Sequence, residues 1–415
     1  MQTALADFIR DTPAGQEANA ILRACVHCGF CTATCPTYLL LGDEQDSPRG
    51  RIYLIKEMLE GHAVTAKTQL HLDRCLTCRS CETTCPSGVR FGRLVELGRQ
   101  VVDSKVGRPF VERAKRWAIR EGMLARPLFT GALGAARTLR PLLPEKLRAQ
   151  IPERRPAGIW PDARHPRKML ALDGCVQGAL APNIDAAMAR VLDRIGISLV
   201  RVRGGGCCGA LPYHLSAEAR AIALVKRNID AWWPHLDRDA EAIVVTASGC
   251  GVMVKDYGHL LQHDPTYAQK AVRIAALARD PVEVVGAEWP RIAPKVAMDV
   301  GSQKVAFHSP CTLQHGMKLV GRVEEILHAL GLELTPVRDS HLCCGSAGTY
   351  SLLQPELSRQ LKANKLAALE AGRPDVIATA NIGCLAHLAD GAKPPVRHWI
   401  ELLDMRMRGG ARAPS

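Results

Sequence analysis

Apolar and polar positions in the second half of the chain follow the periods of strands and helices, and the same order of elements occurs twice. Each copy has a short apolar strand, a helix with one apolar face, a second strand, a longer helix and a final strand of the buried type. The elements lie at residues 168–172, 184–195, 198–202, 217–232 and 242–246 in the first copy, and at 304–307, 323–330, 333–337, 356–369 and 375–379 in the second. This order predicts two α/β domains, each with a parallel sheet.

A capped helix is predicted near the N-terminus, where Ser47 suits the N-cap and Pro48 the first helical position. Gly61 suits the position after the last turn. Apolar residues such as Ile52 and Ile55 fall on one face of this helix. The segment therefore predicts a helical N-terminal module, rather than one built on short β-strands.

Two cysteine runs flank this helix, at residues 25–36 and 75–86, and each reads C-x2-C-x2-C-x3-C-P. The doubled pattern is typical of bacterial two-cluster ferredoxins, in which the fourth Cys of each run binds the cluster of the other run. It predicts two [4Fe–4S] clusters. The first would be held by Cys25, Cys28, Cys31 and Cys85, and the second by Cys75, Cys78, Cys81 and Cys35.

Zinc and disulfides are the alternatives for these eight cysteines. A C-x2-C pair alone would suit zinc, but eight cysteines in this doubled order are difficult to arrange as tetrahedral sites. Disulfides need an oxidising compartment, and the N-terminus shows an early acid, Asp7, and no apolar segment of a secretory signal. We therefore expect reduced cysteines in the cytoplasm. Arg49 and Arg51, on the intervening helix, would either face the anionic clusters or lie on a solvated face.

The other eight cysteines recur with the two α/β copies, one after the first strand, two in a Cys-Cys-Gly after the second, and one after the third. They are Cys175, Cys207, Cys208 and Cys250, then Cys311, Cys343, Cys344 and Cys384. In both copies 31 residues separate the first Cys from the Cys-Cys pair. Open α/β sheets bind ligands beyond the carboxyl ends of their strands. Each copy is therefore predicted to gather four thiolates into a metal or cluster site. Buried structural cysteines, the alternative, would leave the recurrence unexplained.

A dinucleotide-binding pattern also has to be weighed, because residues 204–209 formally match G-x-G-x-x-G. The corresponding segment of the second copy, residues 339–345, lacks these glycines and keeps the two cysteines. The feature that the copies share is the cysteine pair, which argues against nucleotide binding.

Composition is that of an ordinary globular protein, with 415 residues of which 47% are hydrophobic and 23% charged. The sequence has no stretch of 18 consecutive apolar residues, the length that a membrane-spanning helix needs. The net charge of +13 is uneven, because residues 101–170 hold 16 Lys and Arg against 6 Asp and Glu. We expect helices and a linker there, either solvated or docking an acidic subunit or an anionic membrane surface. Few aromatic residues are present to stack on bases, so nucleic acid is not expected as a partner.

Two ferredoxin motifs followed by two Cys-x31-Cys-Cys-Gly units resemble the cysteine-rich-domain family. Its members include subunits of heterodisulfide reductase, anaerobic glycerol-3-phosphate dehydrogenase, lactate-utilisation systems and glycolate oxidase. Residues 25–31, 46–52 and 308–316 resemble most the glycolate oxidase branch. The resemblance implies an α+β multidomain fold. Its parts would be a helical ferredoxin domain at 1–105, a basic helical segment and linker at 106–165, and two duplicated α/β cysteine-rich (CCG) domains at 166–295 and 296–415.

The resemblance also implies an oxidoreductase subunit that does not turn over substrate alone. Partner flavoprotein subunits would convert glycolate to glyoxylate, and this chain would pass electrons to a quinone or another respiratory acceptor. It would lie in the cytoplasm or peripherally on the cytoplasmic face of the inner membrane. The alternatives are a lactate or glycerol-3-phosphate dehydrogenase subunit, a thiol–disulfide reductase whose Cys-Cys sites are catalytic, and a scaffold.

The chain departs from the fullest family pattern at the end of each CCG unit. That pattern ends in C-x2-C. Here the place of the last cysteine is taken by Met253, three residues after Cys250, and by His387, three residues after Cys384. Both side chains can bind metals, Met weakly and His well, but their difference argues that they are not interchangeable ligands. The two units are left open to a further iron–sulfur cluster, to zinc or to no occupant.

Overall fold

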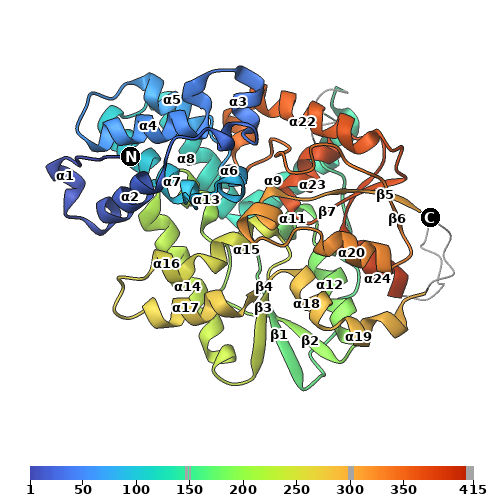
Figure 1. The fold of residues 1–415 in the computed structure, drawn as a ribbon. Coiled ribbons are helices and arrows are strands. Elements are labelled where there is room, and N and C mark those ends of the chain that lie inside the picture. Colours follow the sequence, from blue (N-terminus) through green and yellow to red (C-terminus); the bar gives the residue numbers. More distant parts are fainter. Residues whose placement is uncertain (145–147, 149–150, 298–302, 408–415) are drawn as a thin grey trace.

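The structure is a computed structural model that describes residues 1–144, 148, 151–297 and 303–407. Figure 1 shows a helical N-terminal module packed across two α/β units. Side chains fix this arrangement on both sides. Arg79 of the module pairs with Asp256 of the first unit at 3.0 Å, and Thr83 Oγ1 lies 2.8 Å from His315 Nδ1 of the second unit.

The N-terminal module is entirely helical in its regular structure. Its helices are α1 (Asp7–Arg10), α2 (Pro13–Ala24), α3 (Pro36–Leu41), α4 (Pro48–Leu59), α5 (Ala66–Asp73), α6 (Ser80–Thr84) and α7 (Phe91–Val106). The capped helix predicted between the cysteine runs is α4, and the Ser47 hydroxyl accepts a hydrogen bond from the Gly50 amide at 3.0 Å. Ile52, Ile55 and Leu59 are buried, as their spacing predicts. The prediction of a helical module is confirmed.

The core of this module lies between α2, α4, α5 and α7. Gly98 shows how closely α4 and α7 pack, because a Cβ at this position would lie 2.8 Å from the Ile55 side chain. The tight crossing holds both cysteine runs on one rigid support.

Two further helices connect this module to the α/β units, α8 (Phe110–Leu124) and α9 (Arg126–Leu139). Neither contains a buried residue, so ionic and backbone contacts hold them in place. Arg116 pairs with Asp73 at 2.9 Å, Arg126 pairs with Asp173, and Arg137 donates to the Ala179 carbonyl at 3.3 Å. The basic segment is thus helical over α8 and α9, which lie along the surface.

The first α/β unit has a four-stranded parallel sheet in the order β2-β1-β3-β4. Its strands are β1 (Arg167–Ala171), β2 (Ile197–Arg201), β3 (Ala240–Val244) and β4 (Ala278–Arg279). Its helices are α11 (Gln177–Leu180), α12 (Asn183–Arg194), α13 (Ala210–His214), α14 (Glu218–Leu236), α15 (Ser248–Lys255), α16 (Tyr257–Leu260), α17 (Ala268–Leu277), α18 (Pro281–Ala287) and α19 (Trp289–Ile292).

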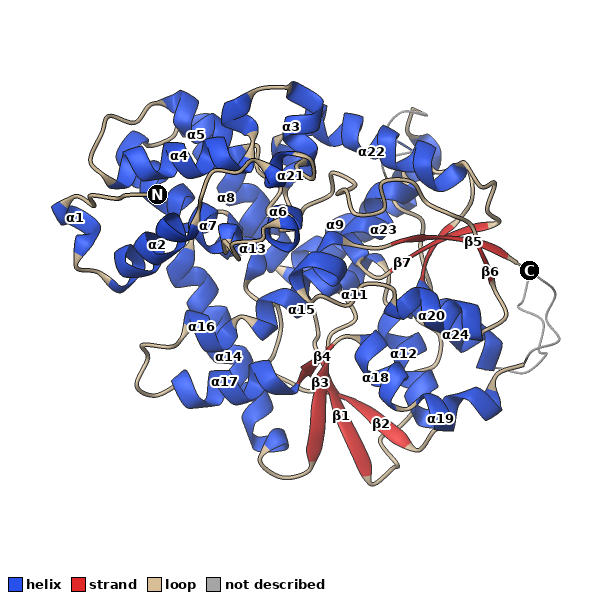
Figure 2. Ribbon diagram, in the orientation of Figure 1, coloured by secondary structure: helices blue, strands red, loops and turns tan. Residues whose placement is uncertain are grey.

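The second unit repeats this topology, with the order β6-β5-β7-β8. Its strands are β5 (Lys304–His308), β6 (Glu333–Leu334), β7 (Val376–Thr379) and β8 (Val396–His398), and Figure 2 shows the two sheets as separate layers among the helices. Its helices are α20 (Arg322–Ala329), α21 (Tyr350–Leu353), α22 (Pro355–Glu370), α23 (Ile382–Ala389) and α24 (Trp399–Met407), with a π-helical turn at Thr312–Gly316.

The prediction of two duplicated parallel α/β domains is confirmed, with two differences. Each sheet has a fourth strand that was not predicted, β4 or β8, because two or three residues are too few to show a strand period. The strand predicted at 333–337 ends at Leu334, and Pro336 just beyond it has no N–H to donate to a neighbouring strand.

The two α/β units share one apolar core rather than standing apart. Helix α24 of the second unit packs against α12 of the first, and Asp404 pairs with Arg190 at 2.7 Å and with Arg194 at 2.8 Å. This contact fixes the position of one sheet, and thus of its carboxyl end, relative to the other.

Candidate metal centres

A small cavity in the N-terminal module collects cysteines from both runs. Cys25, Cys28 and Cys31 of the first run line it together with Cys85, the last cysteine of the second run. Arg49 lines the same cavity and pairs with Glu44 at the surface. The structure thus brings together the four residues that the spacing predicts as ligands of one cluster.

A second cavity lies beside the first and has the reciprocal composition. Cys75, Cys78 and Cys81 of the second run line it with Cys35 of the first run. Cys81 also borders the first cavity. This is the crossed grouping that the doubled motif predicts, and it depends on the two runs folding against each other.

The two cysteine loops share an unusual backbone. His27 and Thr77 occupy the same place in the two motifs and have φ of 57° and 52°, while Gly29 and Arg79 have φ of 87° and 60°. Positive φ is uncommon for residues other than glycine and persists where the surroundings require it. Each loop therefore curls in the same way, which directs successive cysteines toward one cavity.

Burial makes these thiols poor sites for an uncompensated negative charge. Burial, with a smaller effect from Cys25, raises the pKa of Cys31 to about 11. Burial also raises the pKa of Cys78 and of Cys81 well above the usual thiol range. A metal centre removes this penalty, because it supplies the positive charge that thiolate ligands need. All sixteen cysteines fall within the described residues and none forms a disulfide, so this donor set fits iron–sulfur clusters.

Arg51 gives the second cavity a buried positive charge. Only 1% of its side chain is exposed, and Nη2 pairs with Asp46 at 3.1 Å. Nε donates to the His71 carbonyl at 2.7 Å, and Nη1 lies 3.9 Å from Cys35 Sγ. Of the two arginines on α4, Arg51 thus faces the cysteines from the interior and Arg49 from the surface.

The two CCG units each bring their four cysteines together. In the second unit Cys311 Sγ lies 3.9 Å from Cys343 Sγ. The glycine after each cysteine pair has a structural role, because the amides of Gly209 and Gly345 each lie 3.4 Å from the first sulfur of the pair, on Cys207 and Cys343. Both glycines have positive φ, 95° and 88°, which glycine adopts without strain.

The last cysteine of each unit lies in the first turn of a helix, Cys250 on α15 and Cys384 on α23. These helix starts face each other across the two units, because the Ser248 amide donates to the Ala380 carbonyl at 3.3 Å. A cavity of about 330 Å³ opens between them. Cysteines of both units line it, and so do Cys75 and Cys78 of the ferredoxin module.

Comparison with known proteins matches both halves of this architecture. Residues 21–89 match the family described as 4Fe-4S dicluster domain, and residues 169–255 and 305–389 match the family described as Cysteine-rich domain. The chain is 54% identical to the glycolate oxidase iron–sulfur subunit of Escherichia coli (strain K12) over 408 residues, which cover 98% of this chain and 99% of that protein. The chain belongs to the family of glycolate oxidase iron–sulfur subunits. It is therefore an iron–sulfur electron-transfer subunit.

More distant relatives show how the family extends. A protein of Bacillus subtilis (strain 168) named "Probable glycolate oxidase iron-sulfur subunit" is 28% identical over 88% of both chains. Lactate utilization protein A of Bacillus velezensis is 32% identical over 248 residues, which cover 56% of this chain and 97% of that protein. The full-length likeness is thus to the glycolate oxidase iron–sulfur subunits.

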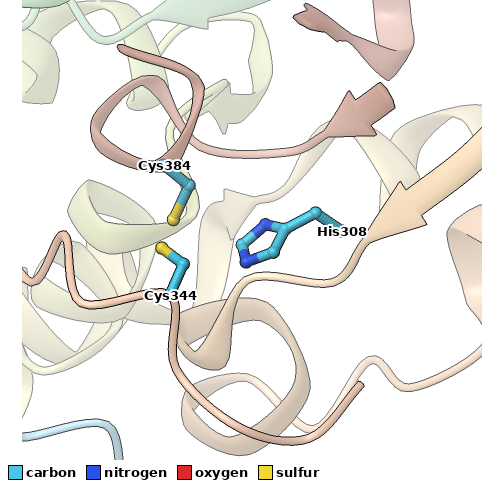
Figure 3. Close-up of side chains that lie close together, drawn as sticks. All are labelled: His308, Cys344 and Cys384. Carbon is cyan, nitrogen blue, oxygen red and sulfur yellow. The ribbon is translucent and has the colours of Figure 1, made fainter. Parts of the chain in front are cut away.

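This glycolate oxidase-type subunit also contains a cluster of possible metal ligands that the sequence analysis did not predict. His308, at the end of β5, lies with Cys344 and Cys384 so that one donor atom of each is within 4.8 Å of the others. Figure 3 shows the imidazole ring pointing toward the two sulfur atoms. Burial lowers the pKa of His308 to about 3, so the ring is neutral and able to bind a metal. The sequence signal that could have identified this residue is its place directly after the apolar strand predicted at 304–307.

The two residues that replace the final family cysteines differ in position. Met253 lines the 330 Å³ cavity beside Cys250. His387 is instead near Ser358, with Nε2 3.4 Å from its hydroxyl, and it does not belong to the group around His308. The inference that these two positions are not equivalent ligands agrees with this geometry.

Proposed function

We propose that this chain is the electron-transfer subunit of a glycolate-oxidising complex, in which partner flavoprotein subunits convert glycolate to glyoxylate. Two [4Fe–4S] clusters would be held by Cys25, Cys28, Cys31 and Cys85, and by Cys75, Cys78, Cys81 and Cys35. The observation that carries the proposal is the pair of adjacent cavities with crossed cysteine sets. Likeness to the Escherichia coli subunit over nearly the full chain supports glycolate as the substrate of the complex.

When bound, such clusters accept and release one electron each, which suits the stepwise unloading of a two-electron donor. The residues around them set how strongly an electron is held. Arg51 places a buried positive charge near Cys35, and the Thr77 amide lies 3.4 Å from Cys75 Sγ. Both contacts stabilise negative charge on sulfur, because charge and hydrogen bonds to sulfur are among the protein's means of tuning cluster potential.

A quinone is the acceptor that the large cavity suits. The cavity reaches Cys78 at one side and is lined by apolar side chains that include Met123, Leu172 and Leu211. His214 also lines it, and its Nδ1 lies 2.9 Å from Glu96. An apolar cavity with a few polar groups is typical of sites for small organic ligands, and quinone reduction needs protonatable groups nearby.

The outer faces of α8 and α9 suit contact with a membrane surface. Phe110, Val111, Trp117 and Leu128 are exposed there, and the segment around them is strongly basic. Apolar and aromatic residues with nearby cations are typical of helices that lie in the interface of an anionic bilayer. Among the described helices, none combines the length and apolar character needed to cross one. We therefore propose peripheral attachment through α8 and α9.

Rapid mixing of the anaerobic native complex with substrate tests the proposal. Glycolate should bleach the cluster absorbance within turnover time, and a short-chain quinone should restore it. The isolated chain should show neither change. Lactate and glycerol 3-phosphate serve as the competing substrates. Bleaching by lactate but not by glycolate would contradict the substrate, and glycolate oxidation by the isolated chain would contradict the subunit role.

A further inference from the structure

The two CCG units have cysteines at matching positions, but different side chains surround the last two cysteines of each unit. The sheet register pairs His308 with Thr379 in the second unit. By the offsets of the cysteines, the corresponding residues of the first unit are Leu172 and Val245. An apolar pair in one unit is therefore replaced by a pair with an imidazole and a hydroxyl in the other. The replacement places polar groups in a buried position, where they are costly unless they have a partner.

The second unit uses its polar pair in an ordered way. His308 Nδ1 lies 3.0 Å from Thr379 Oγ1, and both residues are buried. A hydrogen bond at one ring nitrogen fixes the orientation of a histidine and leaves the other nitrogen for a metal. In addition, Asn381 Nδ2 donates to Cys384 Sγ at 3.4 Å, whereas the matching position in the first unit is Ala247.

We propose that the second CCG unit binds a single zinc ion through His308 Nε2, Cys344 Sγ and Cys384 Sγ, and that the first CCG unit has no equivalent site. One ring nitrogen of His308 and the two sulfur atoms already lie within 4.8 Å of one another. Mixed nitrogen and sulfur donors are the set that Zn²⁺ prefers. Two thiolates and a neutral imidazole would also balance the charge of the ion, which suits a site where all three side chains are at most 4% exposed.

The site stands apart from the proposed [4Fe–4S] ligands, none of which belongs to it. Cys311 and Cys343 lie outside the ligand set. They contact each other at 3.9 Å and pack near Cys78, and Cys343 also contacts its neighbour Cys344. Cys384 borders the 330 Å³ cavity. Three protein ligands leave one coordination position for water or another small ligand.

Metal analysis of the anaerobically purified full chain, together with zinc X-ray absorption, tests the site. The wild type should contain about one zinc per chain, with two sulfur neighbours and one nitrogen neighbour in the protein ligand set. The variant His308→Leu, which copies the first unit, should lose zinc at least about tenfold, because a three-ligand site is reduced to two. The matched control is His328→Leu, which removes an exposed histidine of the same unit, on α20, and should retain zinc.

A ligand-exchange variant covers the case in which His308→Leu fails to fold. His308→Cys should retain zinc and raise the sulfur neighbours from two to three. The proposal is overturned if wild-type protein holds no stoichiometric zinc, or if His308→Leu retains it. It is also overturned if His328→Leu loses zinc equally, or if zinc in His308→Cys keeps two sulfur neighbours.

Discussion

Cys85 lies at the same cavity as Cys25, although the two residues belong to different cysteine runs. Cys35 has the reciprocal relation to Cys75 in the neighbouring cavity. Neither cavity is complete in cysteines without a residue from the other run. Each proposed cluster would therefore bind cysteines of both runs, and the two runs should fold as one cooperative unit.

The crossed grouping predicts which pairs of variants should look alike. Cys85→Ser and Cys28→Ser should damage the same cluster, and Cys35→Ser and Cys78→Ser should damage the other, because the members of each pair share a cavity. Electron paramagnetic resonance spectra of the four reduced variants provide the comparison. If Cys85→Ser instead reproduces the spectrum of Cys78→Ser, each run binds its own cluster and the crossed assignment is wrong.

Arg51 and Arg49 make a matched pair for stability, because both lie on α4 but only Arg51 is buried. Arg51→Met leaves the buried carboxylate of Asp46 with less compensation and should lower the free energy of unfolding by about 3–5 kcal/mol. Arg49→Met removes an exposed pair with Glu44 and should lower the free energy of unfolding far less, because solvent screens exposed ion pairs. Anaerobic denaturant unfolding of the cluster-loaded protein measures both. Equal losses would show that burial of Arg51 carries no special weight.

Asp280 should make stability depend on pH. Burial raises the pKa of this carboxyl group to about 7, above its value in the unfolded chain. The protonated form is thus favoured in the folded protein, and stability should fall by about 1.4 kcal/mol per pH unit as pH rises from about 5 to 7, then level off.

The variant Asp280→Asn tests this dependence, because the amide oxygen can still accept the hydrogen bond from the Val282 amide. Its free energy of unfolding should lack this decline between pH 5.5 and 7. Asp239→Asn, at an exposed position, serves as the control and should keep the wild-type slope. A wild-type slope in Asp280→Asn would mean that another group titrates.

Gly345 should be far less replaceable than Gly321, although both have positive φ. A Cβ at Gly345 would lie 2.7 Å from the Ser358 carbonyl oxygen, whereas at Gly321 it would meet nothing within 4 Å. Gly321→Ala should cost only the conformational penalty of about 1–2 kcal/mol, and Gly345→Ala clearly more. Thermal or denaturant unfolding gives the difference. Similar losses would mean that the backbone near Cys344 adjusts freely.

Much of this structure follows from local sequence signals. The capped helix α4, the succession of elements along each unit and the grouping of cysteines can be predicted because caps, periods and spacings are short-range features. Other features depend on tertiary contacts. The burial of Arg51 is not apparent on a helix with a mixed face, and β4 is too short to show a period. His308 is likewise not apparent as a candidate ligand, because its partners Cys344 and Cys384 are distant from it in the sequence.

The central claim is that the N-terminal module holds two [4Fe–4S] clusters that act as one-electron carriers. Iron and sulfide analysis combined with a reductive titration followed by electron paramagnetic resonance tests it most directly. The account predicts about eight iron atoms per chain and two one-electron centres, with Cys28→Ser and Cys78→Ser each removing a different centre. About four iron atoms with a single centre, or two centres that persist in both variants, would contradict it.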